Sequence, residues 1–263
     1  MIVEQIYTAN EYRNFNYLIA CPETGDALAI DPLASDLVLA RAKDKGWTIR
    51  QVLNTHEHAD HTGGNAAVIA ATGAKLLAHH KAKDRIAGID IGLKAGDVVK
   101  IGRTVALRSL DTPGHTMSHI CLLSDTDAPS LFCGDTLFNA GAGNCHGGGH
   151  PEALYETFAD QLAKLPDATR IFPGHDYLAN NLAFTLDREP GNARAQEMLP
   201  AAKAQNPTKA TITTLALEKE VNVFFRLHSP IVVRRLREAF PDLPDAPTPK
   251  QVFVKLRELR NTW

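Results

Sequence analysis

The sequence predicts an α/β fold as far as residue 176 and a purely helical part after it. Short apolar runs bounded by turn residues alternate with helical patterns up to residue 176. Several of these runs end in residues with metal-binding side chains, and past residue 176 only helical patterns remain. We therefore expect two domains, at residues 1–176 and 177–263.

The chain before residue 55 reads as an antiparallel meander followed by a helix and a further strand. The turn signals Pro22-Glu23-Thr24-Gly25-Asp26 and Asp31-Pro32 separate the apolar runs. A helical pattern then ends at Gly46, a residue that often follows the last helical turn. The expected strands lie at 2–7, 17–20, 27–30 and 49–54, and the expected helix at 35–46.

The remaining elements of the first domain follow from the same reasoning. Pro151 opens a helix that carries Leu154, Phe158 and Leu162 four residues apart on one face. A short helix is expected at 66–72, and strands at 75–78, within 97–110 as a pair, and at 120–123, 130–133 and 170–172. Helices are expected in the second domain at 177–187, 193–204, 215–221, 230–240 and 249–260.

The composition indicates a protein without a general polyanion-binding surface. A formal net charge of −2 over 263 residues argues against nucleic acid and anionic membranes as partners. The four cysteines are dispersed and form no C-x-x-C pair, which suits reduced thiols. Neither a signal-peptide pattern nor an apolar run of about 18 residues is evident, so we expect a cytoplasmic protein.

The most informative stretch runs from Thr55 to His61 and reads Thr-His-Glu-His-Ala-Asp-His. Three histidines and an aspartate at the end of a strand would each need a polar partner, and a metal ion supplies one. Other strand ends carry further ligand-type residues, namely His115, Asp135 and His175.

These residues suffice for two metal ions. His56, His58 and His115 form one group, Asp60, His61 and His175 form another, and Asp135 can serve both as a bridging carboxylate. Two ions about 3.5–4 Å apart with a hydroxide between them are typical of hydrolases, because the hydroxide serves as a nucleophile at neutral pH. The nitrogen and oxygen ligands suit zinc, iron and manganese alike and do not choose among them. Zinc is the expected metal, with iron or manganese as alternatives.

Residues 56–61 contain the H-x-H-x-D-H signature, formed by His56, His58, Asp60 and His61. With this signature the chain resembles the metallo-β-lactamase superfamily. More narrowly it resembles the glyoxalase II (hydroxyacylglutathione hydrolase) family, with matching residues at 55–64, 114–120, 134–138, 174–177, 218–219, 222 and 224–226. The resemblance implies an αββα sandwich with a C-terminal α-helical domain. It also implies a metal-dependent thioester hydrolase that converts S-D-lactoylglutathione to D-lactate and glutathione.

The same resemblance implies how glutathione is held. Tyr177 matches a glutathione-binding tyrosine, and Arg257 with Arg260 matches a basic pair in the terminal helix. The sequence departs from the family in the glycine-rich loop 141–149. Asn144 stands where the family has a basic residue that contacts glutathione, and His146 is the candidate to take over that contact. This loop leaves open whether glutathione is the thiol carrier. The oligomeric state is also open, and a monomer is compatible with the sequence.

Other activities fit the sequence less well than the hydrolase does. A persulfide dioxygenase would bind a single iron through His56, His115 and Asp135, but this family tends to have cysteine at the position of His119. A nuclease of the same superfamily is disfavoured by the acidic balance, and a non-catalytic protein by the complete ligand set. His119 is expected either to orient a ligand or to be a core histidine, and His79 and His80 are expected on the surface.

Overall fold

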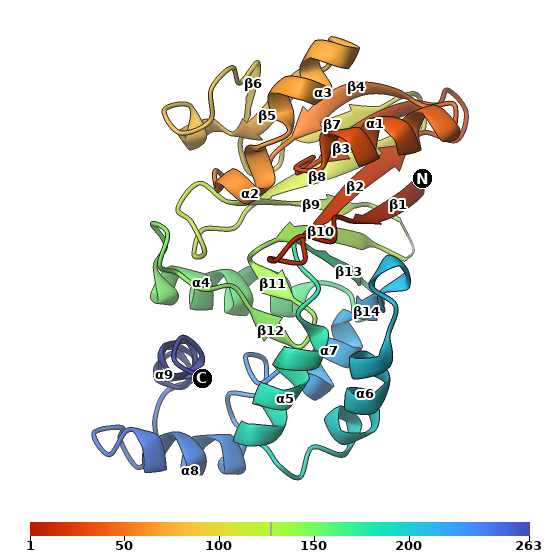
Figure 1. Ribbon diagram of the computed structural model, residues 1–263. Coiled ribbons are helices and arrows are strands. Elements are labelled where there is room, and N and C mark those ends of the chain that lie inside the picture. Colours follow the sequence, from red (N-terminus) through yellow and green to blue (C-terminus); the bar gives the residue numbers. More distant parts are fainter. Residues whose placement is uncertain (127) are drawn as a thin grey trace.

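The computed structural model describes residues 1–126 and 128–263 and contains two mixed six-stranded sheets that lie face to face (Figure 1). In the first sheet, strands β1, β2 and β3 pair antiparallel, and β3 to β6 pair parallel. Its strands follow the order of the chain: β1 (Ile2–Tyr7), β2 (Phe15–Ala20), β3 (Asp26–Ile30), β4 (Thr48–Leu53), β5 (Lys75–His79) and β6 (Ile91–Leu93).

The second sheet has the order β14-β13-β10-β9-β8-β7. Only β10 and β13 pair parallel in it. Its strands are β7 (Val98–Ile101), β8 (Val105–Asp111), β9 (Ile120–Ser124), β10 (Ser130–Gly134), β13 (Arg170–Pro173) and β14 (Thr213–Thr214). A separate small hairpin consists of β11 (Leu137–Phe138) and β12 (Gly141–Ala142).

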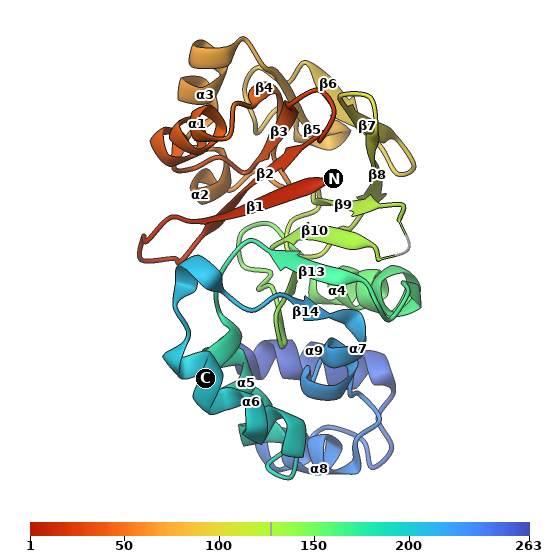
Figure 2. The same ribbon diagram turned by 90° about the vertical axis from the view of Figure 1, so that its right-hand side faces the viewer.

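Helices cover the outer faces of both sheets. In Figure 2 the helices α1 (Ser35–Asp44), α2 (Ala59–Thr62) and α3 (Asn65–Thr72) lie beside the first sheet, and the remaining helices lie beyond the second. Those beyond the second sheet are α4 (Pro151–Glu156), α5 (Leu178–Arg188), α6 (Ala193–Ala204), α7 (Leu215–Val221), α8 (Pro230–Ala239) and α9 (Pro249–Arg260). The layers therefore run helix, sheet, sheet, helix, as predicted.

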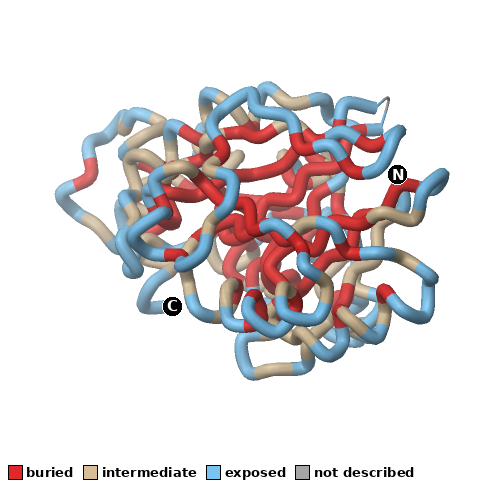
Figure 3. The backbone as a smooth tube through the Cα atoms, turned by 90° about the horizontal axis from the view of Figure 1, so that it is seen from above, coloured by how far each residue is buried: buried red, intermediate tan, exposed pale blue. Residues whose placement is uncertain are grey.

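Side chains alternate between separate cores because successive residues of a strand face opposite sides of the sheet. In β2, Tyr17 and Ile19 belong to the core between the two sheets, whereas Leu18 packs with Val38 of α1. In β10, Phe132 faces the same inter-sheet core and Leu131 faces the helices beyond the second sheet. Figure 3 shows the resulting buried chain through the middle of the molecule.

The predicted strands and helices are present, and the structure adds some that the pattern did not reveal. The strand β6 and the two-residue strands β11, β12 and β14 were not predicted. β14 shows that strand structure does not end at residue 176, because Thr213 and Thr214 pair with β13 and extend the second sheet. Two residues are too few for a periodic pattern, so this strand depends on its partner.

The expectation that His79 lies on the surface is wrong. Its side chain is buried at the end of β5, where Nδ1 accepts a hydrogen bond from the backbone N–H of Lys81 at 3.3 Å. Its Nε2 lies 3.4 Å from a carboxylate oxygen of Asp111.

Across the described residues, no helix combines the length and the apolar character that crossing a bilayer requires.

Candidate active site

The four strands β4, β8, β10 and β13 end at one edge of the sandwich and deliver the candidate ligands there. The loop after β4 carries His56 and His58, and its last residues form α2, which contains Asp60 and His61. The parallel pairs β3 with β4 and β10 with β13 bring their carboxyl ends together. The list of ligand-type residues beyond these strand ends is His56, His58, Asp60, His61, His115, Asp135 and His175.

The first group of ligands consists of three histidines. His56 Nε2 lies 3.1 Å from His58 Nδ1, and His115 Nε2 lies 3.0 Å from the same His58 nitrogen. Three ring nitrogens so close to one another, with two of the rings buried, are positioned to share one ion. The structure thus brings together His56, His58 and His115, the residues expected to form the first group.

The second group combines a carboxylate with two histidines. His61 Nε2 lies 3.3 Å from His175 Nε2, and each of these nitrogens lies 3.5 Å from the same oxygen of Asp60. His61 and His175 are buried and Asp60 is half-buried. This set is also close enough to bind one ion.

Asp135 lies between the two groups. One of its carboxylate oxygens is 3.3 Å from His61 Nε2, and the other is 3.1 Å from His175 Nε2 and 3.6 Å from His115 Nε2. Among the described residues, no hydrogen-bond donor reaches its buried Oδ1. Burial raises the pKa of Asp135, but His175, His61 and His115 outweigh it and hold that pKa well below the usual range. A buried anion with a free oxygen fits a carboxylate that binds metal on both sides.

Each ligand histidine has an acceptor at its other ring nitrogen. This arrangement is typical of metal sites, where the outer hydrogen bond fixes the ring and its tautomer. The pairs are His56 Nδ1 with Thr55 Oγ1 (3.0 Å), His58 Nε2 with the Gly147 carbonyl (3.1 Å), His61 Nδ1 with Asp31 Oδ2 (3.0 Å), His115 Nδ1 with the Asn144 carbonyl (2.6 Å), and His175 Nδ1 with the Tyr12 carbonyl (2.6 Å). The residues present therefore fit a metal centre.

Asp31 is a functional residue that the sequence analysis missed. Its carboxylate accepts hydrogen bonds from the Thr55 N–H (2.8 Å), the Thr55 hydroxyl (2.7 Å) and His61 Nδ1. Burial lowers the pKa of His61, but Asp135, Asp31 and Asp60 outweigh it and raise that pKa to about 9. In the sequence, Asp31 precedes Pro32, and this pair by itself indicates only a turn. Nothing in the local pattern shows that β3 places it beside the β4 loop.

His119 is buried beside Asp135 and is not a member of either ligand group. Its Nε2 accepts a hydrogen bond from the Asp135 backbone N–H at 3.2 Å, so Nδ1 carries the proton. That nitrogen lies 3.0 Å from the hydroxyls of Thr112 and Thr136. The ring also stacks on His56, with centroids 5.2 Å apart. Of the two roles considered for His119, the structure supports the orienting one.

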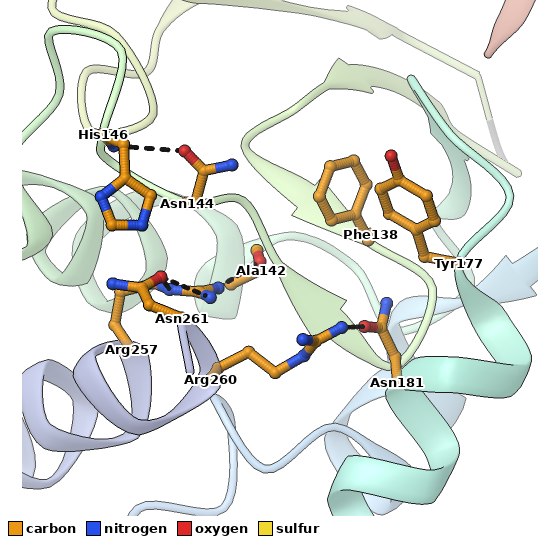
Figure 4. Close-up of a pocket in the computed structure, with 9 residues that line it drawn as sticks. All are labelled: Phe138, Ala142, Asn144, His146, Tyr177, Asn181, Arg257, Arg260 and Asn261. Atoms are coloured by element: carbon orange, nitrogen blue, oxygen red, sulfur yellow. Dashed lines mark hydrogen bonds between the residues drawn. The ribbon is translucent and has the colours of Figure 1, made fainter. Parts of the chain in front are cut away.

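A pocket of about 220 Å³ is lined by residues of the β11–β12 hairpin, the loop that follows it, the start of α5 and α9 (Figure 4). Tyr177 stacks on the ligand His175, with ring centroids 4.9 Å apart and planes 5° apart. Figure 4 shows Arg257 and Arg260 reaching into the same region from α9. The lining residues are Phe138, Ala142, Asn144, His146, Tyr177, Asn181, Arg257, Arg260 and Asn261. All five predicted substrate-binding residues are thus in one pocket wall.

Family models match the chain in two consecutive segments. The model described as "Metallo-beta-lactamase superfamily" matches residues 16–175, and the one described as "Hydroxyacylglutathione hydrolase C-terminus" matches residues 176–263. Fold and site together define a protein of the metallo-β-lactamase superfamily with a histidine and aspartate metal site.

Curated relatives narrow this class. The hydroxyacylglutathione hydrolase of Polaromonas sp. is 68% identical over 263 residues, and that of Nitrosococcus oceani is 66% identical, each comparison covering 100% of both chains. The chain therefore belongs to the hydroxyacylglutathione hydrolase (glyoxalase II) family, as the sequence motifs predicted.

Solved structures share the fold at lower identity. The crystal structure of ETHE1 from Myxococcus xanthus has a TM-score of 0.70 at 25% identity and covers 99% of this chain and 92% of its own. The crystal structure of the BLEG-1 B3 metallo-beta-lactamase has a TM-score of 0.66 at 20% identity and covers 85% of this chain and 99% of its own. The second similarity concerns the fold alone.

Proposed function

We propose that the chain hydrolyses glutathione thioesters and converts S-D-lactoylglutathione and water to D-lactate and glutathione. The observation that carries the proposal is its full-length similarity to hydroxyacylglutathione hydrolases, combined with a complete set of metal-binding residues beside a cationic pocket. We further propose two divalent ions per chain, with zinc as the expected metal, and a cytoplasmic location. The cytoplasm suits the four cysteines, which are all free thiols.

The seven candidate ligands would hold the two ions, with Asp135 contributing to both groups. Divalent ions bound there would supply Lewis-acid polarisation of the thioester carbonyl and a water molecule acidified enough to react at neutral pH. Asp60 would act as a ligand and not as the general base. Because a thiolate is a good leaving group, the residues around the site do not need to provide a strong general acid.

The pocket is suited to the glutathione part of the substrate. Glutathione carries two carboxylates, and arginine forms two-pronged hydrogen bonds with such groups. The charges acting on Arg257 and Arg260 include no carboxylate of the described residues. Burial lowers the pKa of Arg257 to about 10 and also lowers that of Arg260. Since a buried cation without an anionic partner is costly, a bound carboxylate would stabilise both groups.

Tyr177 would connect this pocket to the reaction centre. Its ring covers the face of His175, while Phe138 packs edge-on against both rings. A thiol carrier lying on Tyr177 and reaching α9 would therefore place its sulfur near the second group of ligands. Asn144 and His146 close the opposite side, where the His146 N–H donates to Asn144 Oδ1 at 3.1 Å. We also propose that residues 177–263 form the substrate-binding part.

The decisive experiment measures thiol release from S-D-lactoylglutathione and oxygen uptake with glutathione persulfide on the same sample, together with its metal content. Thiol release without oxygen uptake is the expected result. Replacing His58 or Asp135 with alanine should abolish that activity and lower the bound metal. His228→Ala, at an exposed position of the helical part, is the matched control and should change neither. Oxygen uptake without thioester hydrolysis would contradict the proposal.

A further inference from the structure

The segment from Ala142 to Gly147 provides the outer hydrogen bonds of two metal-binding histidines. The Asn144 carbonyl accepts from His115 Nδ1 at 2.6 Å, and the Gly147 carbonyl lies 3.1 Å from His58 Nε2. Both histidines belong to the first group of ligands. The orientation of their rings therefore depends on where this backbone segment lies.

Close packing shows how tightly the segment lies against the metal-binding residues. A side chain at Gly143 would collide with the Asp135 carbonyl and come within 3.2 Å of His115 Nδ1. A side chain at Gly147 would collide with the imidazole of His58. Gly143 and Gly147 are therefore required for close approach of the backbone.

Arg257 holds the other side of this segment. Its Nη1 donates to the Ala142 carbonyl at 2.7 Å and the Gly143 carbonyl at 3.2 Å. Its Nε and Nη2 donate to Asn261 Oδ1 at 3.2 and 3.0 Å, which fixes the plane of the guanidinium. As a residue, Arg257 is only 4% exposed. Helix α9 is thus linked to the metal site by one arginine and two backbone carbonyls.

Arg260 provides a natural comparison because it lies one helical turn further along α9 and lines the same pocket. Its guanidinium contacts Asn181 Oδ1 at 3.4 Å and lies over the rings of Phe184 and Trp263. None of these contacts reaches the segment 142–147. The two arginines therefore share the pocket but not the connection to His115.

We infer, on the metal-dependent function proposed above, that Arg257 is a positioning residue for the first group of metal ligands. It fixes the carbonyl segment that orients His115 and His58, in addition to any contact with the substrate. Arg260 acts on the substrate side alone. Loss of Arg257 should therefore weaken metal binding even when no substrate is present, and loss of Arg260 should not.

The test compares cobalt(II) binding to the full-length wild type and to Arg257→Met, Arg257→Lys and Arg260→Met, by competition with a chelator and by visible absorption. Removing an outer hydrogen-bonding group typically costs about 10–100-fold in metal affinity. Arg257 acts one contact further out, so we expect a loss of about ten-fold, the lower end of this range, and an altered cobalt spectrum in Arg257→Met. Arg257→Lys, which keeps one donor for the carbonyls, should lie between it and the wild type. Arg260→Met should bind cobalt as the wild type does and should raise the KM for the thioester.

Unchanged cobalt affinity in Arg257→Met would overturn the inference, whatever its effect on KM. Circular dichroism shows whether that variant is folded. Where it is not, Arg257→Lys decides, and wild-type cobalt affinity in that variant overturns the inference as well. Cobalt binding requires no turnover, so the two proposals can fail separately. If the wild type binds cobalt but releases no thiol from the thioester, the proposed reaction is refuted and the role of Arg257 in metal binding is not.

Discussion

Replacing Glu218 with glutamine should remove a pH dependence of stability that the buried carboxyl group imposes. Glu218 is fully buried in α7, where it accepts hydrogen bonds from the Thr213 hydroxyl (2.6 Å), the Ala140 N–H (2.8 Å) and the Asn222 side chain (2.9 Å). Burial raises its pKa from 4.5 to about 7, although these donors pull in the opposite direction.

The sign and size of the effect follow from this shift. Because the folded protein retains the proton that the unfolded chain loses near pH 4.5, the contribution is fully present below that pH and is lost as the pH rises through about 7. A shift from 4.5 to about 7 corresponds to about 3 kcal/mol in the free energy of unfolding. For a chain of this length this amounts to about 6–12 °C in Tm.

The assay is urea or thermal unfolding of the wild type and Glu218→Gln at several pH values between 4 and 8.5. Other titrating groups are common to both proteins and cancel in the difference between them. Relative to the wild type, the glutamine variant should gain stability as the pH rises, by about 3 kcal/mol in total. Glu238→Gln, at an exposed position of α8, is the control and should show a constant difference. A constant difference for Glu218→Gln would refute the reasoning.

Two other variants probe the groups that orient the metal ligands. In Asp31→Asn the backbone can keep its φ of 48°, because asparagine also tolerates this region. An amide replaces the carboxylate that accepts hydrogen bonds from the Thr55 hydroxyl and His61. Metal affinity should therefore fall about 10–100-fold in a chelator competition. Retained affinity would exclude the proposed role of Asp31. Gly147→Ala places a methyl group against the His58 ring and should also weaken metal binding, whereas Gly191→Ala, at an open position, should not. Equal metal affinities of the two alanine variants would contradict this packing.

The ligand residues could be predicted from the sequence because each follows an apolar strand. His56, His115 and His175 follow within four residues of the ends of recognisable strands. β8, β10 and β13 run in the same direction in the second sheet, so their carboxyl ends lie at one edge. The groups that orient them could not be predicted in the same way. Asp31 is recognisable only through its pairing across β3 and β4, and the carbonyls of Asn144 and Gly147 carry no signal in the side-chain sequence.

The same limit applies to elements that depend on a distant partner. β14 has two residues and exists because β13 offers it an edge, with Thr213 opposite Ile171 and Thr214 opposite Arg170. His79 begins a polar pair in the sequence, yet β5 turns its side chain inward toward Asp111. In both cases the tertiary contact determines the local structure, so the local pattern alone was misleading.

Arg257 and Arg260 illustrate why spacing cannot assign separate roles to neighbouring residues. Three positions apart on one helix, they predict a common cationic face, and both do line the pocket. Only the structure shows that Arg257 donates to the backbone beside His115, while Arg260 lies among Asn181 and two aromatic rings. A substrate carboxylate that reached Arg257 would therefore touch a group that also supports the metal site, so occupation of the pocket and the geometry of the first ligand group would be linked through a single side chain.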